Sequence, residues 1–206
     1  MPDMSIASHW LERNQRDFLQ VAQRERSALE LRVSPANREL RGLLQRIAVE
    51  QTEVQRLSTR LAELDALRPI TVADVVRAPG ELRMHESIVL SRRIRKRAAE
   101  REATRRAFDA ARLRLARDEE RRAELLAVVK LSIRRTIGEV ECLRAHYGRR
   151  AEVAARGVAH RSPAAASALG LLHGVSVLPL PAWVDVDVLE RSLLPEQLLT
   201  VTTVSA

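Results

Sequence analysis

The most constraining feature of this sequence is a stretch of 77 residues, from Glu81 to Gly157, that contains no proline. Ala, Arg, Glu and Leu dominate it, and these residues favour helix. At a rise of about 1.5 Å per residue, an unbroken helix of this length would extend for about 115 Å, far beyond the diameter of a compact domain. Such a helix cannot bury its own apolar stripe. The sequence therefore predicts a partner helix and an extended all-α fold.

The composition agrees with a narrow helical seam instead of a broad globular core. The 206 residues include only 2 Trp, 2 Phe and 1 Tyr, although aromatic side chains carry much of the buried area of compact folds. The hydrophobic content of 46% nevertheless argues against disorder along most of the chain.

The cellular compartment is predicted from cysteine usage and from apolar runs. The single cysteine, Cys142, cannot close an intramolecular disulfide, and the first residues lack the pattern of a secretory leader. No run approaches the roughly 18 apolar residues that a membrane span requires. We therefore expect a cytoplasmic protein without a membrane span.

The first arm of the predicted hairpin covers residues 7–68. Ser34 and Pro35 interrupt it, and the sequence leaves open whether they cause a kink or a full break with a new helix starting at Pro35. After this point apolar residues recur in steps of three and four, with Gln51 as a polar member that would fix the register. The predicted seam residues are Leu40, Leu44, Ile47, Val54, Leu57, Leu61 and Leu64.

A connector, residues 69–80, is bounded by Pro69 and Gly80, and the second arm covers residues 81–157. Its seam is thin over residues 98–122 and strong again at Leu126, Val129, Ile133, Ile137 and Val140. Two arms joined by a short connector fold back most simply as an antiparallel hairpin. We then expect residues 47–64 to face the apolar start of the second arm, and residues 126–147 to face residues 10–29.

The tail, residues 162–206, differs from the hairpin because it is apolar and contains several prolines. Val184, Val186 and Val188 alternate with Asp185 and Asp187, a weak strand pattern. Apolar segments of this density are costly when exposed, so we expect the tail to be either disordered or docked on a partner surface.

Charge is unevenly distributed along the chain. Residues 1–80 carry 12 basic and 11 acidic groups (+1), residues 81–161 carry 22 and 12 (+10), and the tail carries 1 and 4 (−3). The run at residues 92–97 is either a solvated helix face or a contact site for an acidic partner. The candidate contact residues are Arg92, Arg93, Arg95, Lys96, Arg97, Arg101 and Arg105.

Patterns that carry catalysis are missing from the sequence. The seven glycines do not form a phosphate-binding loop, and the five histidines never approach one another or an acidic pair at metal-ligand spacing. We therefore expect neither enzymatic activity nor a cofactor or metal.

The sequence between Ser8 and Arg161 resembles the central-stalk proteins of type III secretion systems, which include the flagellar export stalk and the stalks of virulence injectisomes. The resemblance lies in the seam from Leu40 to Leu64, the break from Pro69 to Gly80, and the stretch RRIRKRAAEREATRRAFDAARLRLARDEERR. Membership would imply a hairpin that enters a hexameric export ATPase and links it to the export gate. It would also imply contacts with secretion chaperones and a peripheral position at the inner membrane.

Two other functions remain open at this point. One is a cytoplasmic scaffold or chaperone-like coiled coil that docks through its apolar tail. The other is a basic helical protein that binds nucleic acid, for which the second arm supplies the positive charge. Against the latter, no aromatic residues are interleaved with the basic run for base stacking.

Overall fold

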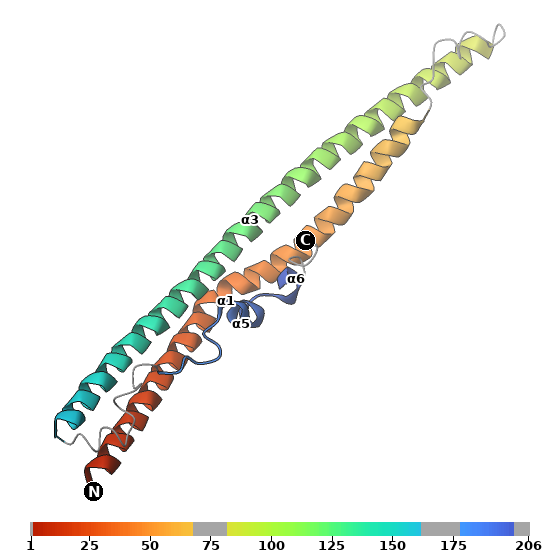
Figure 1. The fold of residues 1–206 in the computed structure, drawn as a ribbon. Helices are drawn as coiled ribbons and strands as arrows, with labels where there is room; N and C mark the ends of the chain where they lie inside the picture. The colour runs from red at the N-terminus through yellow and green to blue at the C-terminus, as the bar shows by residue number, and fades with distance from the viewer. Residues whose placement is uncertain (1, 68–81, 162–177, 200–206) are drawn as a thin grey trace. The chain divides into compact units, whose positions relative to one another are not determined.

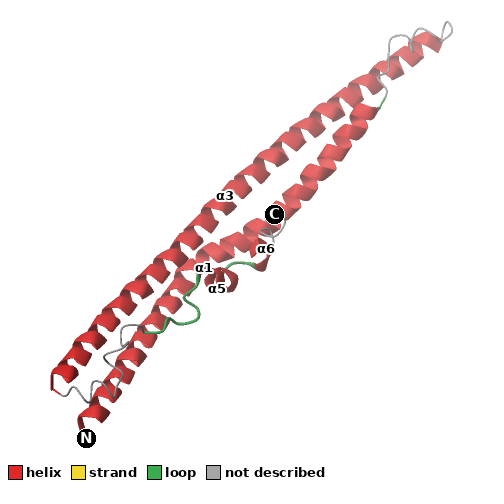
Figure 2. Ribbon diagram, viewed as in Figure 1, coloured by secondary structure: helices red, strands yellow, loops and turns green. Residues whose placement is uncertain are grey.

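The computed structural model describes residues 2–67, 82–161 and 178–199, and this part of the chain is helical and contains no β-strand (Figure 2). The two long helices are α1 (Pro2–Ala66, 65 residues) and α3 (Leu82–Arg161, 80 residues). They pack against each other as a hairpin, with the short helices α5 (Val186–Leu193) and α6 (Glu196–Leu199) in an irregular C-terminal segment (Figure 1). The expected all-α hairpin is confirmed. The predicted connector lies outside the described residues.

Helix α1 continues through Pro35, so the alternative of a full break is wrong. A proline inside a helix loses one backbone hydrogen bond and costs about 3 kcal/mol. Pro35 itself is exposed, whereas Val33 and Asn37 on either side of it are buried. Packing of the buried face therefore keeps the backbone helical where local propensity alone favours a new start.

The packing divides the chain into two compact units. The first unit combines residues 1–41 with 124–206, and the second unit comprises residues 42–123. In the first unit, Asn14 Nδ2 donates to the carbonyl oxygen of Tyr147 at 3.1 Å, and the rings of Phe18 and Tyr147 lie 6.0 Å apart. These contacts confirm the expected facing of residues 126–147 and 10–29 at its Tyr147 end. The buried apolar residues of the two long helices here are Phe18, Ala22, Leu29, Val33, Leu40, Leu125, Val129, Ile133, Val140, Ala151 and Ala155.

In the second unit the seam is one-sided. Helix α1 buries Leu43, Ile47, Leu57 and Leu64, whereas α3 buries only Ala111 between residues 91 and 123. Ion pairs join the helices across this seam, among them Arg46–Asp118 at 3.1 Å and Arg101–Asp65 at 2.7 Å. As residue numbers rise along α1 they fall along α3, which makes the pairing antiparallel.

The pairing register corrects one expectation. Residues 47–64 face residues 100–118 of α3, not its apolar start, because Glu50 pairs with Arg114 and Arg60 with Glu100. The first residues of α3 lie beyond the last described residue of α1 (Figure 1).

The predicted seam residues divide by burial. Leu40, Ile47, Leu57, Leu64, Val129, Ile133 and Val140 are buried, and Leu44, Val54, Leu61, Leu126 and Ile137 are half-buried. Gln51 is exposed, so its assignment to the seam is wrong. The buried polar residues described in the two long helices are instead Asn14, Asn37 and Thr136. Leu43 is also buried; it lies three residues after Leu40 and four before Ile47, and the predicted seam had Leu44 in its place.

The weak strand predicted over residues 184–188 is wrong. Asp185 is the N-cap of α5, and its Oδ1 accepts a hydrogen bond from the backbone nitrogen of Val188 at 3.0 Å. Asp187 then lies in the first helical turn, where a negative charge is favoured. The alternation of valine and aspartate therefore reflects capping. The described part of the tail is docked on the first unit, with Leu178, Trp183, Leu189 and Leu194 buried.

Candidate functional site

The strongest candidate for partner binding is a basic segment near the start of α3, made of Arg92, Arg93, Arg95 and Lys96. All four side chains are exposed. The Arg101–Asp65 pair lies near the last described residue of α1, so the basic segment occupies a part of α3 that has no described α1 residue beside it. Exposure of the nearby Ile88 (48%) and Ile94 (42%) agrees with this. The segment therefore combines exposed positive charge with partly exposed apolar side chains.

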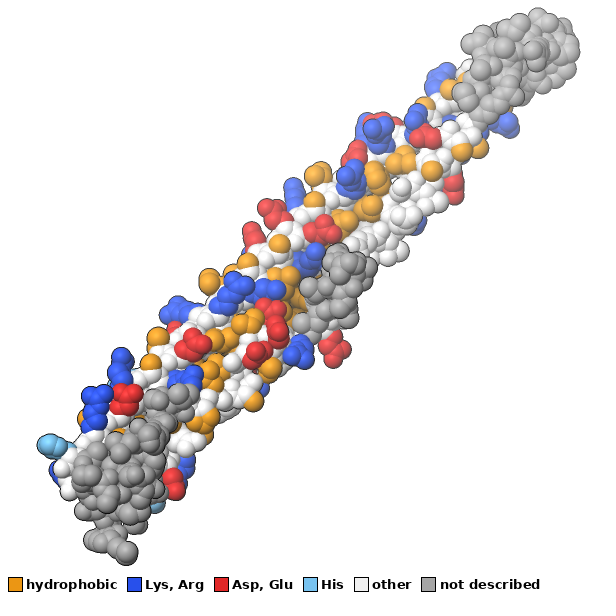
Figure 3. Space-filling view, viewed as in Figure 1, with side chains coloured by type: hydrophobic (Ala, Val, Ile, Leu, Met, Phe, Trp, Pro, Cys, Tyr) orange, Lys and Arg blue, Asp and Glu red, His pale blue; other side chains and the backbone are white. Residues whose placement is uncertain are grey.

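The remaining members of the predicted basic face have other surroundings. Arg97 is half-buried and already interacts with another residue. Arg101 is committed to the hairpin through its 2.7 Å ion pair with Asp65, whereas Arg105 is exposed. The seven residues thus do not form one continuous free surface. Elsewhere on the visible face, Lys and Arg are interspersed with Asp and Glu (Figure 3).

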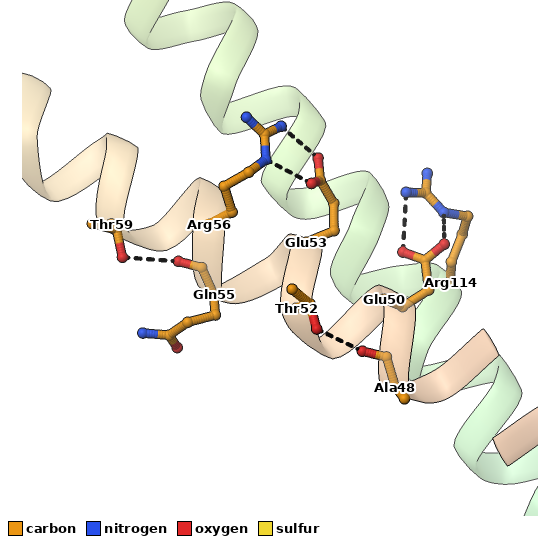
Figure 4. A network of polar contacts seen from close by, with 8 residues as sticks. All are labelled: Ala48, Glu50, Thr52, Glu53, Gln55, Arg56, Thr59 and Arg114. Atoms are coloured by element: carbon orange, nitrogen blue, oxygen red, sulfur yellow. Dashed lines mark hydrogen bonds and ion pairs between the residues drawn. The ribbon is translucent and has the colours of Figure 1, made fainter. Parts of the chain in front are cut away.

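Charged contacts along the second unit hold the two helices in register (Figure 4). Arg114 donates from Nε and Nη2 to the two carboxylate oxygens of Glu50, at 2.8 and 3.1 Å. These hydrogen bonds, together with the carboxylate charge, raise the pKa of Arg114. On α1, the hydrogen bonds from Arg56 lower the pKa of Glu53. The pairs are exposed, so dissolved salt screens them.

A second candidate surface lies in the first unit, where the docked segment, defined as residues 178–199, packs on α1 and α3. Asn37 Nδ2 donates to the carbonyl oxygen of Leu193 at 2.6 Å, and Arg144 Nε donates to that of Leu178 at 2.7 Å. Lys130 Nζ lies 3.4 Å from Glu190 Oε2. The spacing of Val33, Asn37 and Leu40 marks Asn37 as a polar residue on the apolar face, a signal that sequence reasoning missed.

Two open surface depressions in the described part of the chain do not group side chains in a catalytic arrangement. A shallow open groove is lined by residues that include Glu25, Arg32, Arg135, Glu139 and the exposed Cys142. Among the described residues, no three His, Cys, Asp or Glu side chains are grouped so as to hold a metal ion. Within the same residues, none of the helices has an apolar stretch long enough to cross a bilayer.

Comparisons with protein-family models, with curated proteins and with solved structures find no match for this chain. Function is therefore inferred from the hairpin, the basic segment and the docked segment.

Proposed function

We propose that this chain is a non-enzymatic coiled-coil stalk or adaptor of a type III protein secretion apparatus, linking the export ATPase to the export gate. The observation that carries the proposal is the antiparallel pairing of α1 and α3, with an exposed basic segment on α3 beyond the last described residue of α1. A paired helical hairpin that carries a cluster of exposed basic side chains is suited to bind an acidic protein surface.

The mechanism is physical. A hairpin held by apolar contacts in both units, with ion pairs across the helices in the second, transmits force or asymmetry between two partners. Exposed guanidinium groups make contacts that are individually weak, form quickly and weaken with salt. Such contacts suit a component that binds and releases its partner repeatedly.

The test is a binding measurement between the purified chain and the hexameric export ATPase. Arg92→Glu, Arg93→Glu and Arg95→Glu together should abolish binding, because three attractive charges become repulsive. The matched control reverses Arg117, Arg134 and Arg149, which are exposed elsewhere on α3. This control has the same net charge as the first variant and should retain binding. Both variants should keep the helicity of the wild type in circular dichroism.

Unchanged binding by the first variant would remove the basic segment as the contact surface. A wild-type chain that binds neither the ATPase nor the gate would remove the secretion role.

A nucleic-acid partner is the second candidate, and the exposed run of Arg92, Arg93, Arg95 and Lys96 is the observation that favours it. A protein that neutralises several phosphates shows an affinity that falls steeply with salt. Titration of duplex DNA across a salt series decides the matter. Absence of binding at about 50 mM salt, where phosphate contacts are strong, would exclude this function.

A further inference from the structure

Two hydrogen bonds from side chains of the long helices hold the docked segment by its main chain, so they do not depend on its side-chain sequence. Asn37 and Arg144 donate to main-chain carbonyl oxygens of the segment, at Leu193 and Leu178. Leu193 is the last residue of α5, where helical carbonyls lack a partner within the helix, so Asn37 caps α5 from outside. Recognition through carbonyl groups accepts any segment with the same backbone course.

Specificity in the docked segment comes from its apolar anchors. Leu178, Trp183, Leu189 and Leu194 are buried, and Leu189 is only 1% exposed. Arg26 lies over the Trp183 ring with its guanidinium carbon 5.8 Å from the ring centroid, which adds a cation–π contact. An occupant of this surface therefore needs an aromatic or aliphatic anchor, a short helix with a buried leucine at the position of Leu189, and a second leucine just past the end of that helix, where Leu194 lies as the C-cap of α5.

Charge favours an acidic occupant. The tail carries 1 basic and 4 acidic residues (−3), whereas the long-helix residues of the first unit, 1–41 and 124–161, carry 15 and 10 (+5). Lys130, one of only two lysines in the chain, pairs with Glu190, and that carboxylate side chain is 19% exposed. The docked segment is thus an acidic amphipathic ligand on a basic surface.

The docking surface also suits exchange of its occupant. Asn37 is buried, and its Oδ1 has no hydrogen-bond partner. Its Nδ2 donates a hydrogen bond to the docked segment. When that segment leaves, water can hydrate the amide of Asn37 as well as the head groups of Lys130 and Arg144. A surface with such polar groups tolerates being uncovered better than a wholly apolar one does.

We propose that the docking surface, formed by Arg26, Asn37, Lys130 and Arg144, is a recognition site for an acidic amphipathic helical segment of a partner protein. The chain's own residues 178–199 occupy this site as a competitor in cis. A partner segment with stronger anchors displaces them. This inference concerns a surface separate from the basic segment and stands whatever apparatus the chain serves.

The test uses the full-length chain and a fluorescent synthetic peptide of residues 178–199. Leu189→Asp in the full chain should release the docked segment, because a carboxylate cannot occupy a fully buried apolar position. The released variant should bind the peptide saturably, and the wild type should bind it at least about tenfold more weakly because its own segment competes at high effective concentration. The control peptide carries Leu189→Asp and Leu194→Asp and should not bind. Adding Asn37→Ala to the released variant should weaken binding.

Helicity by circular dichroism confirms that each variant is folded. Glu190→Lys, which places a second positive charge beside Lys130, is an independent means of release if Leu189→Asp disturbs the fold. The proposal fails if neither released variant binds the peptide, if the wild type binds it equally well, or if the control peptide binds. A concentration-dependent dimer of the wild type in sedimentation would assign the surface to the tail of a second copy and overturn the proposal.

Discussion

Thr136 offers the sharpest test of how the first unit is packed. Its side chain is 0% exposed, and its hydroxyl oxygen has no hydrogen-bond partner. The other threonines of α1 and α3 donate to the carbonyl oxygen four residues earlier, as Thr52 does to Ala48 at 2.9 Å and Thr59 does to Gln55 at 3.0 Å (Figure 4). Thr104 does the same with Glu100. Thr136 therefore carries a desolvation cost that these residues avoid.

Thr136→Val removes that cost while preserving shape and β-branching. A buried unsatisfied polar group costs about 1–3 kcal/mol, and valine and threonine have similar helix propensities. Because valine also adds apolar contact, we expect the variant to be more stable by about 1–2 kcal/mol. Thr136→Ser is the matched control: it keeps the hydroxyl and deletes one methyl group, so it should lose about 1 kcal/mol.

Urea unfolding followed by circular dichroism measures the change, and the slope of free energy against urea should stay constant in both variants. Amide hydrogen exchange at Ile133 and Val140 locates the effect, since both flank Thr136 on the buried face of α3. A valine variant that is no more stable than the wild type would show that the hydroxyl is satisfied. The packing argument for this position would then fail.

Two further predictions concern single positions on the helices. Gly138→Ala should stabilise the chain by about 1 kcal/mol in the same urea assay, because a Cβ there meets nothing within 4 Å and alanine favours helix over glycine; a loss of stability would contradict this. Arg56→Gln should raise the pKa of Glu53 toward that of a free glutamate, as read from carbon-13 NMR shifts, because the hydrogen bonds from Arg56 hold it down. The depressed pKa means that the contribution of the pair is present above the ordinary glutamate pKa and is lost as pH falls through the folded value; a pKa unchanged by Arg56→Gln would refute the assignment.

The fold class follows from the sequence because helix formation and the need for a partner helix are properties of long segments. A proline-free run of 77 residues and regular apolar steps require little tertiary information. The register of α1 against α3, in contrast, does require tertiary information. Contacts such as Asn14–Tyr147 and Glu50–Arg114 set which parts of α1 and α3 meet, and heptads alone permit several offsets. That is why the expected partner of residues 47–64 was wrong.

The docking of residues 178–199 could not be predicted from the sequence for a related reason. The Val184–Val188 alternation matches a strand locally, but Asp185 acts as a cap because a surface is available for the apolar face of α5. The same surface explains why a polar residue, Asn37, is buried on the apolar face of α1. Its side-chain amide is costly to bury there unless the carbonyl oxygen of Leu193 accepts a hydrogen bond from it. Neither residue's role can be derived from its neighbours in the sequence.

The two proposed recognition features share no residues and belong to different units. The basic segment lies within residues 42–123, whereas the docking surface draws on residues 1–41 and 124–206. Arg92, Arg93 and Arg95 are exposed in the second unit, so their charge reversal leaves the apolar contacts of the first unit intact. Release of the docked segment likewise leaves the Glu50–Arg114 pair in place. Loss of partner binding in one set of variants therefore identifies the surface responsible, because the other surface serves as its internal control.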